Sequence, residues 1–432
     1  MRATKARVGR VRQKGLKHSL IEAASELGPG VVTGAADDDP SGIATYSQAG
    51  AQFGYGLLWT MILTYPLMTA VQLVSGHIGR VTGAGLAKNL ADTFPRSVVT
   101  VLVAILLIAN IMNIGADLSA MAAATELVIG GRTRVFVFLF ALLSVALQLF
   151  VPYHQYARVL KWLTLSLFAY VGVLLLVEVD WTAAFWGMIW PTDIGPGAIA
   201  TVVAVLGTTI SPYLFFWQSS QEAEDLADSG QRPLKQDPRG ASAQFRRIRF
   251  DTFVGMAFSN LIALAIMIAS AATLHQQGIT QINTAAQAAE ALRPIAGQFA
   301  FAMFALGIIG TGLLAVPVLA GSAAFAVSET RGWKGGLEYK PQQAARFYAI
   351  IVAATAAGVL LDWGNVNPIR ALVWSAILNG VAAVPLMAAM MVIASRRKEM
   401  GRFVAAPMVL VFGWAATAVM AIATILFFAS LI

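Results

Sequence analysis

Long runs of apolar residues, separated by short polar segments, are the dominant pattern of this chain. A helix needs about 20 apolar residues to cross the roughly 30 Å hydrocarbon core of a bilayer. Stretches of about this length or longer lie at residues 27–53, 55–79, 98–128, 133–151, 157–178, 197–226, 250–274, 295–327, 344–362, 370–395 and 405–431. The pattern therefore predicts an all-α integral membrane protein with eleven transmembrane helices.

The first and the sixth of these spans are interrupted by a proline among polar residues. The first contains "DDDPSG" at residues 37–42, and the sixth contains "TTISPY" at residues 208–213. Because the two breaks are five spans apart, an odd number, the second unit enters the membrane from the opposite side. This predicts two inverted repeats at residues 27–178 and 197–395, preceded by a basic arm at 1–26 and followed by a further helix at 405–431.

Interrupted helices at matching positions of two inverted halves are typical of a substrate site near the bilayer midplane. Proline lacks a backbone N–H, so a carbonyl in the preceding turn loses its helical partner. Such a carbonyl is costly in lipid unless it lines a cavity or holds an ion. Both half-helices also direct their negative C-terminal ends toward the same central region, which favours a cation.

The composition supports a membrane protein and narrows its chemistry. Hydrophobic residues make up 58% of the chain and charged residues 12%, and cysteine is absent, so thiolate metal sites are excluded. The four histidines are scattered, which argues against a histidine-built metal or hydrolase centre. No phosphate-binding loop or catalytic triad pattern occurs, so we expect no enzyme activity and no resident cofactor.

The net charge of +8 is a signal of membrane topology rather than of nucleic-acid binding. With the N-terminus in the cytoplasm, all but four of the 30 Lys and Arg residues fall on the cytoplasmic side. The four exceptions are Arg132, Arg134, Arg293 and Arg370. The positive-inside rule thus predicts a multi-pass protein of the cell (inner) membrane with its C-terminus outside. The expected partners are the lipid bilayer and a small substrate, with no obligate protein partner.

Several segments resemble the Nramp family of divalent metal-ion transporters. The stretch "GPGVVTGAADDDPSGIATYSQAGAQFGYGLLW" at residues 28–59 is similar to the first-helix region of that family. Shorter stretches, "SGHIGRVTGAGLA", "ADLSA" and "GTTISPYLFFWQSS", resemble its second, third and sixth helices. The resemblance implies a LeuT-type fold and a divalent cation bound at the breaks of helices one and six.

Carried over residue by residue, the resemblance places the metal site at Asp39, Gly42, Thr208 and Ser211. Asp39 matches the family's aspartate and Thr208 its carbonyl donor, but Gly42 replaces an asparagine and Ser211 a methionine. A site without the thioether offers oxygen only, which suits hard cations better than transition metals. We expect Gly42 to leave room for a partly hydrated Mg²⁺, which sheds water reluctantly. These departures resemble the Nramp-related magnesium transporter branch.

The residues expected to carry protons in this family are mostly replaced. Asp117 retains the third-helix aspartate, but Ala120 replaces a glutamate, and Tyr213 and Gln218 replace two histidines. Tyrosine, with an ordinary pKa near 10, and an uncharged amide are poor relays at neutral pH. The sequence therefore predicts Mg²⁺ uptake by alternating access without proton coupling, with Mn²⁺ as a second substrate. The alternative is a proton-coupled Mn²⁺/Fe²⁺ symporter of the ordinary Nramp type.

Other intramembrane polar residues are candidates for the ion pathway. Asp37 and Asp38 either approach the hydration shell of the ion or are protonated beside Asp39. Glu222, with Glu224 and Asp225, forms either an acidic exit vestibule or a solvated helix end. Asn379 reaches the central cavity or bonds a neighbouring helix.

Two further classes of transport protein remain to be separated from a metal carrier. An amino-acid transporter of the same fold would direct helix N-termini at a substrate carboxylate, which the crowded aspartates would repel. A channel would give a flux that does not saturate, whereas a carrier saturates.

Overall fold

The computed structural model describes residues 33–34, 36–151, 155, 166–192, 195–362 and 367–431. Within those residues the protein is entirely helical, with no strand. The longer helices are α3 (Pro40–Phe53), α4 (Trp59–Thr82), α6 (Arg96–Ile129), α7 (Thr133–Phe150), α11 (Pro196–Thr209), α12 (Pro212–Asp228), α13 (Ala241–Thr273), α16 (Ala300–Arg331), α17 (Ala345–Asp362), α18 (Pro368–Ser395) and α20 (Pro407–Ala429). The shorter ones are α5 (Leu86–Thr93), α9 (Phe168–Val173), α10 (Trp181–Ile189), α14 (Ala285–Glu290), α15 (Arg293–Ala296) and α19 (Arg397–Met400), with 3-10 turns at His275–Gln277 and Gly297–Phe299.

Each of the eleven predicted spans contains a described helix. Eight helical segments are long and apolar enough to cross a membrane: α4, α6, α7, α11 with α12, α13, the segment that ends with α16, α18 and α20. The first, fifth and ninth predicted spans contain the shorter α3, α9 and α17. Much of the fifth span, at residues 156–165, lies outside the described residues, as do the basic arm at 1–26 and the start of the first span.

Both predicted helix interruptions are present. Residues 33–34 and 36–37 are helical, the chain bends at residue 38, and α3 starts at Pro40 with Asp39 as its N-cap. In the sixth span α11 ends at Thr209, and α12 starts at Pro212 with Ser211 as its N-cap. Proline suits the first helical position because its fixed φ fits the helix and its missing N–H has no partner there. We refer to residues 38–40 as the first break and residues 210–212 as the sixth break.

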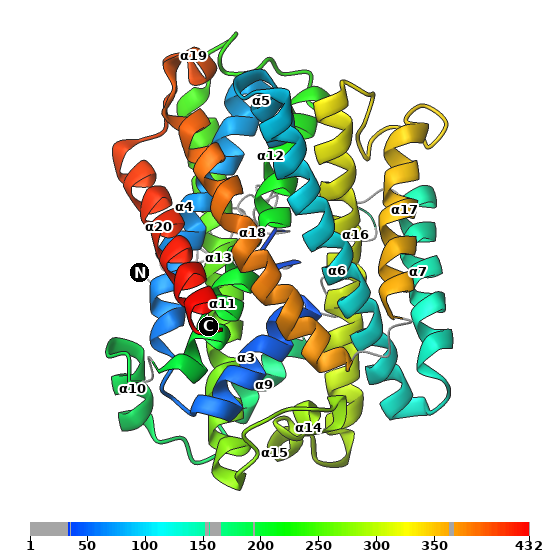
Figure 1. Ribbon diagram of the computed structural model, residues 1–432, viewed down its shortest axis with the longest axis vertical. Helices are drawn as coiled ribbons and strands as arrows, with labels where there is room; N and C mark the ends of the chain where they lie inside the picture. Colours follow the sequence, from blue (N-terminus) through cyan, green and yellow to red (C-terminus); the bar gives the residue numbers. More distant parts are fainter. Residues whose placement is uncertain are drawn as a thin grey trace, which may run out of the picture.

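The basic connections gather at one end of the bundle. Figure 1 shows α5, α19 and the ends of α12 and α16 at the top, and α10, α14 and α15 at the bottom. The connections near residues 80–97, 227–249, 329–346 and 396–402 therefore share one end, which we call the basic end. The charge rule predicts that this end faces the cytoplasm.

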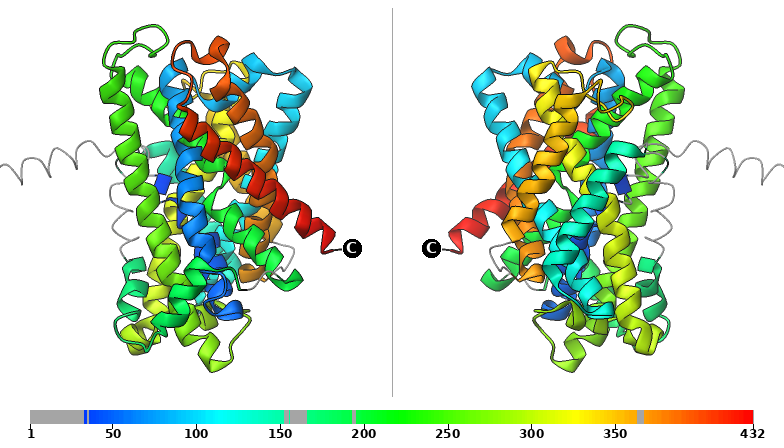
Figure 2. Two further views of the ribbon diagram at one scale, coloured as in Figure 1. Left: turned by 90° about the vertical axis from the view of Figure 1, so that its left-hand side faces the viewer. Right: turned by 90° about the vertical axis from the view of Figure 1, so that its right-hand side faces the viewer.

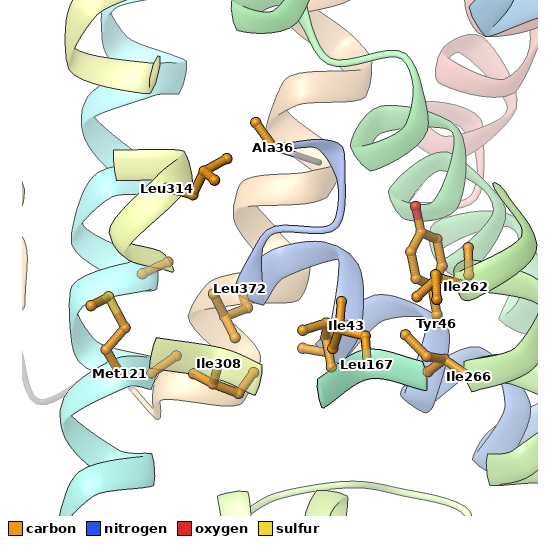
Figure 3. Packing of buried hydrophobic residues seen from close by; sticks show 14 of the residues in the cluster. Ala36, Ile43, Tyr46, Met121, Leu167, Ile262, Ile266, Ile308, Leu314 and Leu372 are labelled. Atoms are coloured by element: carbon orange, nitrogen blue, oxygen red, sulfur yellow. The ribbon is translucent and has the colours of Figure 1, made fainter. Parts of the chain in front are cut away.

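Helix α3 lies at the centre of the bundle. It packs against α13, α18 and α11, whereas α12 packs against α4. Figure 3 shows Ile43 and Tyr46 of α3 among buried apolar side chains, with Ile262 and Ile266 of α13 beside Tyr46. The first span therefore contacts the seventh, and the sixth contacts the second. Two inverted repeats predict this reciprocal pairing, because each broken helix then packs on the second helix of the other repeat. It supports that organisation, and the repeat boundaries remain a prediction.

Two helices of the second half meet at unusually close range. A β-carbon at Gly207 of α11 would lie 2.0 Å from the carbonyl oxygen of Ala376 and 2.5 Å from the backbone nitrogen of Gly380, both in α18. Small residues allow such approach between membrane helices. The contact lies one residue before Thr208, so it fixes the position of this part of α11 against α18. Helix α20 lies obliquely on the outside, against α4 and α18 (Figure 2).

Candidate metal-ion site

Asp39 lies at the first break and is almost completely buried, with 1% of its surface exposed. One carboxylate oxygen accepts hydrogen bonds from Ser41 Oγ at 2.6 Å and from the backbone N–H of Gly42 at 2.7 Å. The other accepts from Asn113 Nδ2 at 2.9 Å and from Tyr213 OH at 3.2 Å. Three helices, α3, α6 and α12, therefore position this carboxylate. A cation that binds it replaces one or more of the four donors, since two donors already occupy each oxygen.

The carbonyl freed by the first proline is bonded to the sixth span. Ala36 lies four residues before Pro40, so its carbonyl has no helical N–H to accept. Instead it accepts a hydrogen bond of 3.0 Å from the hydroxyl of Tyr213 in α12. The same hydroxyl therefore contacts both the free carbonyl and the carboxylate of Asp39.

The carbonyl freed by the second proline is bonded locally. Thr208 lies four residues before Pro212, and its carbonyl oxygen is 2.9 Å from the hydroxyl of Ser211. That hydroxyl is also 2.7 Å from the carbonyl of Gly207, so it donates within its own break. Thr208 and Ser211, which the resemblance implies as ligands, are thus adjacent, and both present oxygen.

The two breaks are in contact through Gly42. A β-carbon at this position would lie 3.2 Å from Thr208 Oγ1, 3.2 Å from Tyr46 Cε2 and 3.3 Å from the carbonyl oxygen of Asp37. Gly42 is therefore in close contact with both spans in this arrangement, and the expectation that it leaves room for a hydrated ion stays a prediction. Neighbouring groups from α3 and α11 close over the glycine because no side chain holds them apart.

Asp37 and Asp38 form a second polar group, separate from the donors around Asp39. Ser259 Oγ of α13 is 2.5 Å from a carboxylate oxygen of Asp37 and 3.2 Å from one of Asp38. Both aspartates are buried. The three consecutive carboxylates therefore turn in two directions: those of Asp37 and Asp38 contact α13, whereas that of Asp39 contacts α6 and α12.

Helix α6 carries a polar stripe that faces this region. Asn110, Asn113 and Asp117 are all fully buried, at a spacing of three and four residues that places them on one helix face. Asn110 donates to the carbonyl of Leu319 and to Ser322 Oγ in α16, whereas Asn113 donates to Asp39. Asn113 was missed as a site residue in the sequence, although its spacing from Asp117 within an apolar helix is a usable signal.

Several buried polar atoms in this region have no hydrogen-bond partner within the described protein. They are Asp37 Oδ1, Asn113 Oδ1, both oxygens of Asp117, Thr208 Oγ1 and both amide atoms of Asn379. Asn379 lies in α18 next to Gly380, the residue that contacts Gly207. Buried polar atoms are normally satisfied by protein, water or an ion. Their concentration around the two breaks fits a site for a cation and its water.

The groups around Asp39 offer a carboxylate together with neutral hydroxyl, amide and carbonyl oxygens. Among the described residues no three His, Cys, Asp or Glu side chains are placed to hold a metal together. Any ion at Asp39 therefore depends on hydroxyl, amide and backbone carbonyl oxygens, or on retained water, for its other ligands. That donor set suits hard cations.

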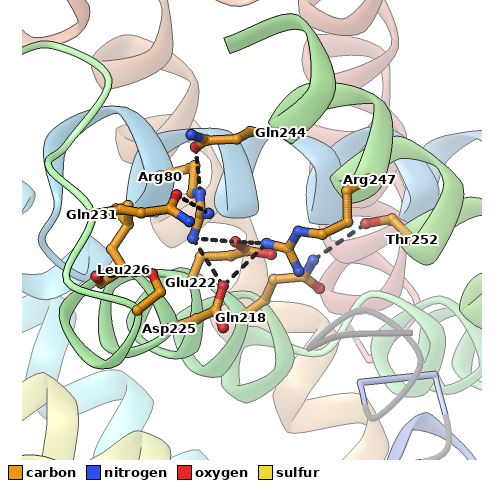
Figure 4. A network of polar contacts seen from close by, with 10 residues as sticks. Arg80, Gln218, Glu222, Asp225, Leu226, Gln231, Gln244, Arg247 and Thr252 are labelled. Carbon is orange, nitrogen blue, oxygen red and sulfur yellow. Dashed lines mark hydrogen bonds and ion pairs between the residues drawn. The ribbon is translucent and has the colours of Figure 1, made fainter. Parts of the chain in front are cut away.

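Glu222 is paired with arginines at the basic end. Its carboxylate is 2.5 Å from Arg247 Nη2 and 3.8 Å from Arg80 Nη1, and Arg80 also reaches Asp225 at 2.9 Å (Figure 4). Glu222 is fully buried beside these cations, so in this arrangement its carboxylate lines neither an open vestibule nor a solvated helix end.

Gln218 and Glu224 are directed elsewhere. Gln218, one turn before Glu222, donates to Thr252 Oγ1 of α13 at 3.2 Å and does not join the hydrogen bonds of Asp39 (Figure 4). Glu224 accepts from the backbone N–H of Leu337 and lines a separate cavity of about 650 Å³. The acidic vestibule predicted from Glu222, Glu224 and Asp225 is therefore not one surface. Glu224 instead shares its cavity with Asp228, Glu329 and Glu338.

Comparison with known proteins agrees with the resemblance read from the sequence. The family model "Natural resistance-associated macrophage protein-like" (Nramp) matches residues 30–430. The "Divalent metal cation transporter MntH" of Yersinia pestis is 30% identical over 295 residues, covering 67% of this chain and 69% of that protein. The protein of the same name from Granulibacter bethesdensis is 27% identical over 415 residues, covering 94% of this chain and 86% of the relative.

Solved structures share the fold. The Eremococcus coleocola manganese transporter superposes with a TM-score of 0.73 at 15% identity, covering 96% of this chain and 88% of that one. The nucleobase-cation-symport-1 family transporter Mhp1 superposes with a TM-score of 0.57 at 13% identity, covering 92% of each chain. The helical bundle with broken first and sixth spans is therefore a LeuT-type fold. Together with the match over residues 30–430, the chain belongs to the Nramp family.

Proposed function

We propose that this protein takes up Mg²⁺, with Mn²⁺ as a second substrate, by alternating access and without proton coupling. The ion binds partly hydrated at the first and sixth breaks, with Asp39 as the charged ligand and Gly42, Thr208 and Ser211 bordering it. Relatives named as divalent metal cation transporters support a divalent substrate. We further propose that the basic end faces the cytoplasm.

The observation that carries the choice of ion is the set of groups around the two breaks. Every side chain hydrogen-bonded to Asp39 presents oxygen or amide nitrogen, and Ser211 takes the position where the family places a thioether. Mg²⁺ prefers one or two carboxylates with several retained waters. The Asp39 carboxylate, with hydroxyl and amide groups as its hydrogen-bond partners, supports that ion more than a dehydrated transition metal.

The groups around Asp39 also support uptake without protons. Tyr213 is at a position where the family commonly has histidine, and its hydroxyl lies within hydrogen-bond distance of both the Ala36 carbonyl and the Asp39 carboxylate. Ala120, at the glutamate position, lines a cavity of about 360 Å³ with Ala44 and cannot titrate. A membrane potential of 100 mV gives a divalent ion about 4.6 kcal/mol, so the potential alone can drive uptake.

Uptake into proteoliposomes tests this function. The full-length protein, reconstituted with a Mg²⁺ indicator and a pH indicator inside, is expected to show saturable, potential-driven Mg²⁺ entry without internal acidification. Mn²⁺ entry is expected to compete with it. Empty liposomes and the Asp39→Ala variant serve as controls.

One observation favours a second candidate, the proton-coupled Mn²⁺/Fe²⁺ symporter. The structure with a TM-score of 0.73 is that of a manganese transporter. If Mg²⁺ fails to enter, or if the lumen acidifies in proportion to Mn²⁺ entry, this second function replaces the first.

A further inference from the structure

A large cavity at the basic end is lined mainly by arginines. Its volume is about 1120 Å³, and it lies between the end of α4, the connection at residues 229–240 and the first turns of α13. The charged residues that line it are Arg80, Arg232, Arg239, Arg246, Arg247 and Asp237. We propose that this arginine pocket binds the phosphate headgroup of an anionic phospholipid from the adjacent membrane leaflet.

Two of these arginines are already occupied by carboxylates that hold the helices together. Arg80 contacts Asp225 at 2.9 Å, and Arg247 contacts Glu222 at 2.5 Å (Figure 4). These pairs join α4 and α13 to α12. They form the inner wall of the pocket, and their positive charge is balanced.

A third arginine is balanced within the connection itself. Arg239 contacts Asp237 at 2.6 Å, and hydrogen bonds from Arg239 lower the pKa of Asp237 to about 2. Asp237 therefore stays ionised at neutral pH and offsets Arg239. Asp237 is the one anionic side chain among the described residues that line the pocket; it is hydrogen-bonded to Arg239, and the charge of Arg232 also lowers its pKa.

Arg232 and Arg246 supply the uncompensated charge. Both are exposed, and neither forms an ion pair or hydrogen bond with any described residue. A guanidinium group binds a phosphate through two parallel hydrogen bonds, which makes arginine the preferred residue for such recognition. Two free guanidinium groups on one cavity therefore point to a ligand with phosphate chemistry.

The apolar surface beside the pocket indicates that this ligand is a lipid. Phe250 lines the pocket and is 48% exposed. Farther along the same helix, Phe253, Val254 and Leu261 are also exposed, at the spacing of one helix face. An apolar face of this kind on a membrane helix contacts acyl chains. Basic pockets between transmembrane helices on the cytoplasmic side are a known setting for anionic headgroups.

Lipid binding to the purified full-length protein tests this inference without reference to transport. Native mass spectrometry in neutral detergent would titrate phosphatidylglycerol against phosphatidylcholine on wild type, on Arg232→Gln with Arg246→Gln, and on the charge-retaining double lysine variant. Arg396→Gln with Arg397→Gln is the matched control, because those arginines are exposed at the same end but do not line the pocket.

We expect phosphatidylglycerol to bind the wild type preferentially and the double glutamine variant about 30-fold more weakly, at about fivefold per arginine. The double lysine variant should keep most of the affinity, and the matched control should equal wild type. Equal weakening in the matched control would overturn the inference. Binding of inorganic phosphate or pyrophosphate to the pocket, with no preference between the two lipids, would overturn the lipid assignment.

Discussion

The two breaks have the same backbone design and different side-chain chemistry. In each, a proline follows the N-cap residue directly and frees the carbonyl four residues earlier. The N-cap is Asp39 in the first break and Ser211 in the sixth. One break therefore supplies a charge and the other supplies only neutral oxygens, so the attraction for a divalent ion comes from one side of the site.

The two freed carbonyls also differ in what satisfies them. That of Ala36 is bonded to Tyr213 from the other half of the protein, whereas that of Thr208 is bonded to the adjacent Ser211. A movement of the sixth span thus breaks the hydrogen bond from Tyr213 to Ala36 of the first span. The bond between Ser211 and Thr208 lies within the sixth span and can rearrange there. The alternating-access motion proposed above would act most directly on Tyr213 and Asp39.

The largest expected effect comes from removing the carboxylate of Asp39, which contacts Tyr213 of the sixth span. Asp39→Asn keeps the size of the side chain but removes the anion, and we expect Mg²⁺ uptake to fall by at least about 100-fold. Tracer or indicator uptake into proteoliposomes measures this change. Asp92→Asn, exposed at the basic end, is the control and should transport normally. Undiminished uptake in Asp39→Asn would remove this residue from the site.

The glycines beside the two breaks should respond very differently to alanine. In Gly207→Ala the new methyl group would meet the carbonyl of Ala376 at 2.0 Å, and we expect a loss of about 3 kcal/mol in the free energy of unfolding. In Gly42→Ala the contacts are 3.2–3.3 Å, and the better helix propensity of alanine offsets about 1 kcal/mol of crowding. Thermal unfolding in detergent compares the two. Equal stability of both variants would contradict the close packing of α11 on α18.

The Asn113→Ala variant tests whether α6 contributes to ion binding at the first break. In Asn113→Ala, Asp39 loses a charge-assisted hydrogen bond, and an amide oxygen leaves the site. We expect the apparent affinity for Mg²⁺ to fall about tenfold. Asn110→Ala is the matched control on the same face, since its amide bonds α16 and its loss should lower stability without changing affinity. The same loss of affinity in both variants would assign Asn113 a structural role only.

The smallest expected effect comes from placing a soft metal ligand in the sixth break, whose N-cap Ser211 is neutral. Ser211→Met introduces a thioether, which favours transition metals over hard cations. We expect the ratio of Mn²⁺ to Mg²⁺ uptake to rise about fivefold, a difference of about 1 kcal/mol. Competition assays give this ratio, with Ser211→Ala as the control for loss of the hydroxyl. A ratio that stays constant in both variants would show that Ser211 does not face the ion.

Features that depend on local sequence could be predicted well. The apolar runs contain the helices, the two prolines interrupt their spans where expected, and the basic connections gather at one end. Each follows from a property of a short segment: its hydropathy, a missing backbone N–H or its charge. The candidate residues Asp39, Thr208 and Ser211 came from the resemblance to the Nramp family, and each lies within four residues before a break proline.

Features that depend on distant partners could not be predicted. Asn113 is 74 residues from Asp39, and Tyr213 is 174 residues away, yet both donate to the same carboxylate oxygen. Likewise, the closed space at Gly42 and the arginine partners of Glu222 arise from segments that only packing brings together.

The sequence by itself therefore determined the membrane-spanning helices, the two breaks and the aspartates that distinguish the first break from the sixth. The tertiary structure alone decided which groups surround those aspartates and how little space the glycine leaves. The physical reason is range: hydropathy and proline act within one or two helical turns, whereas side-chain contacts depend on how whole helices pack.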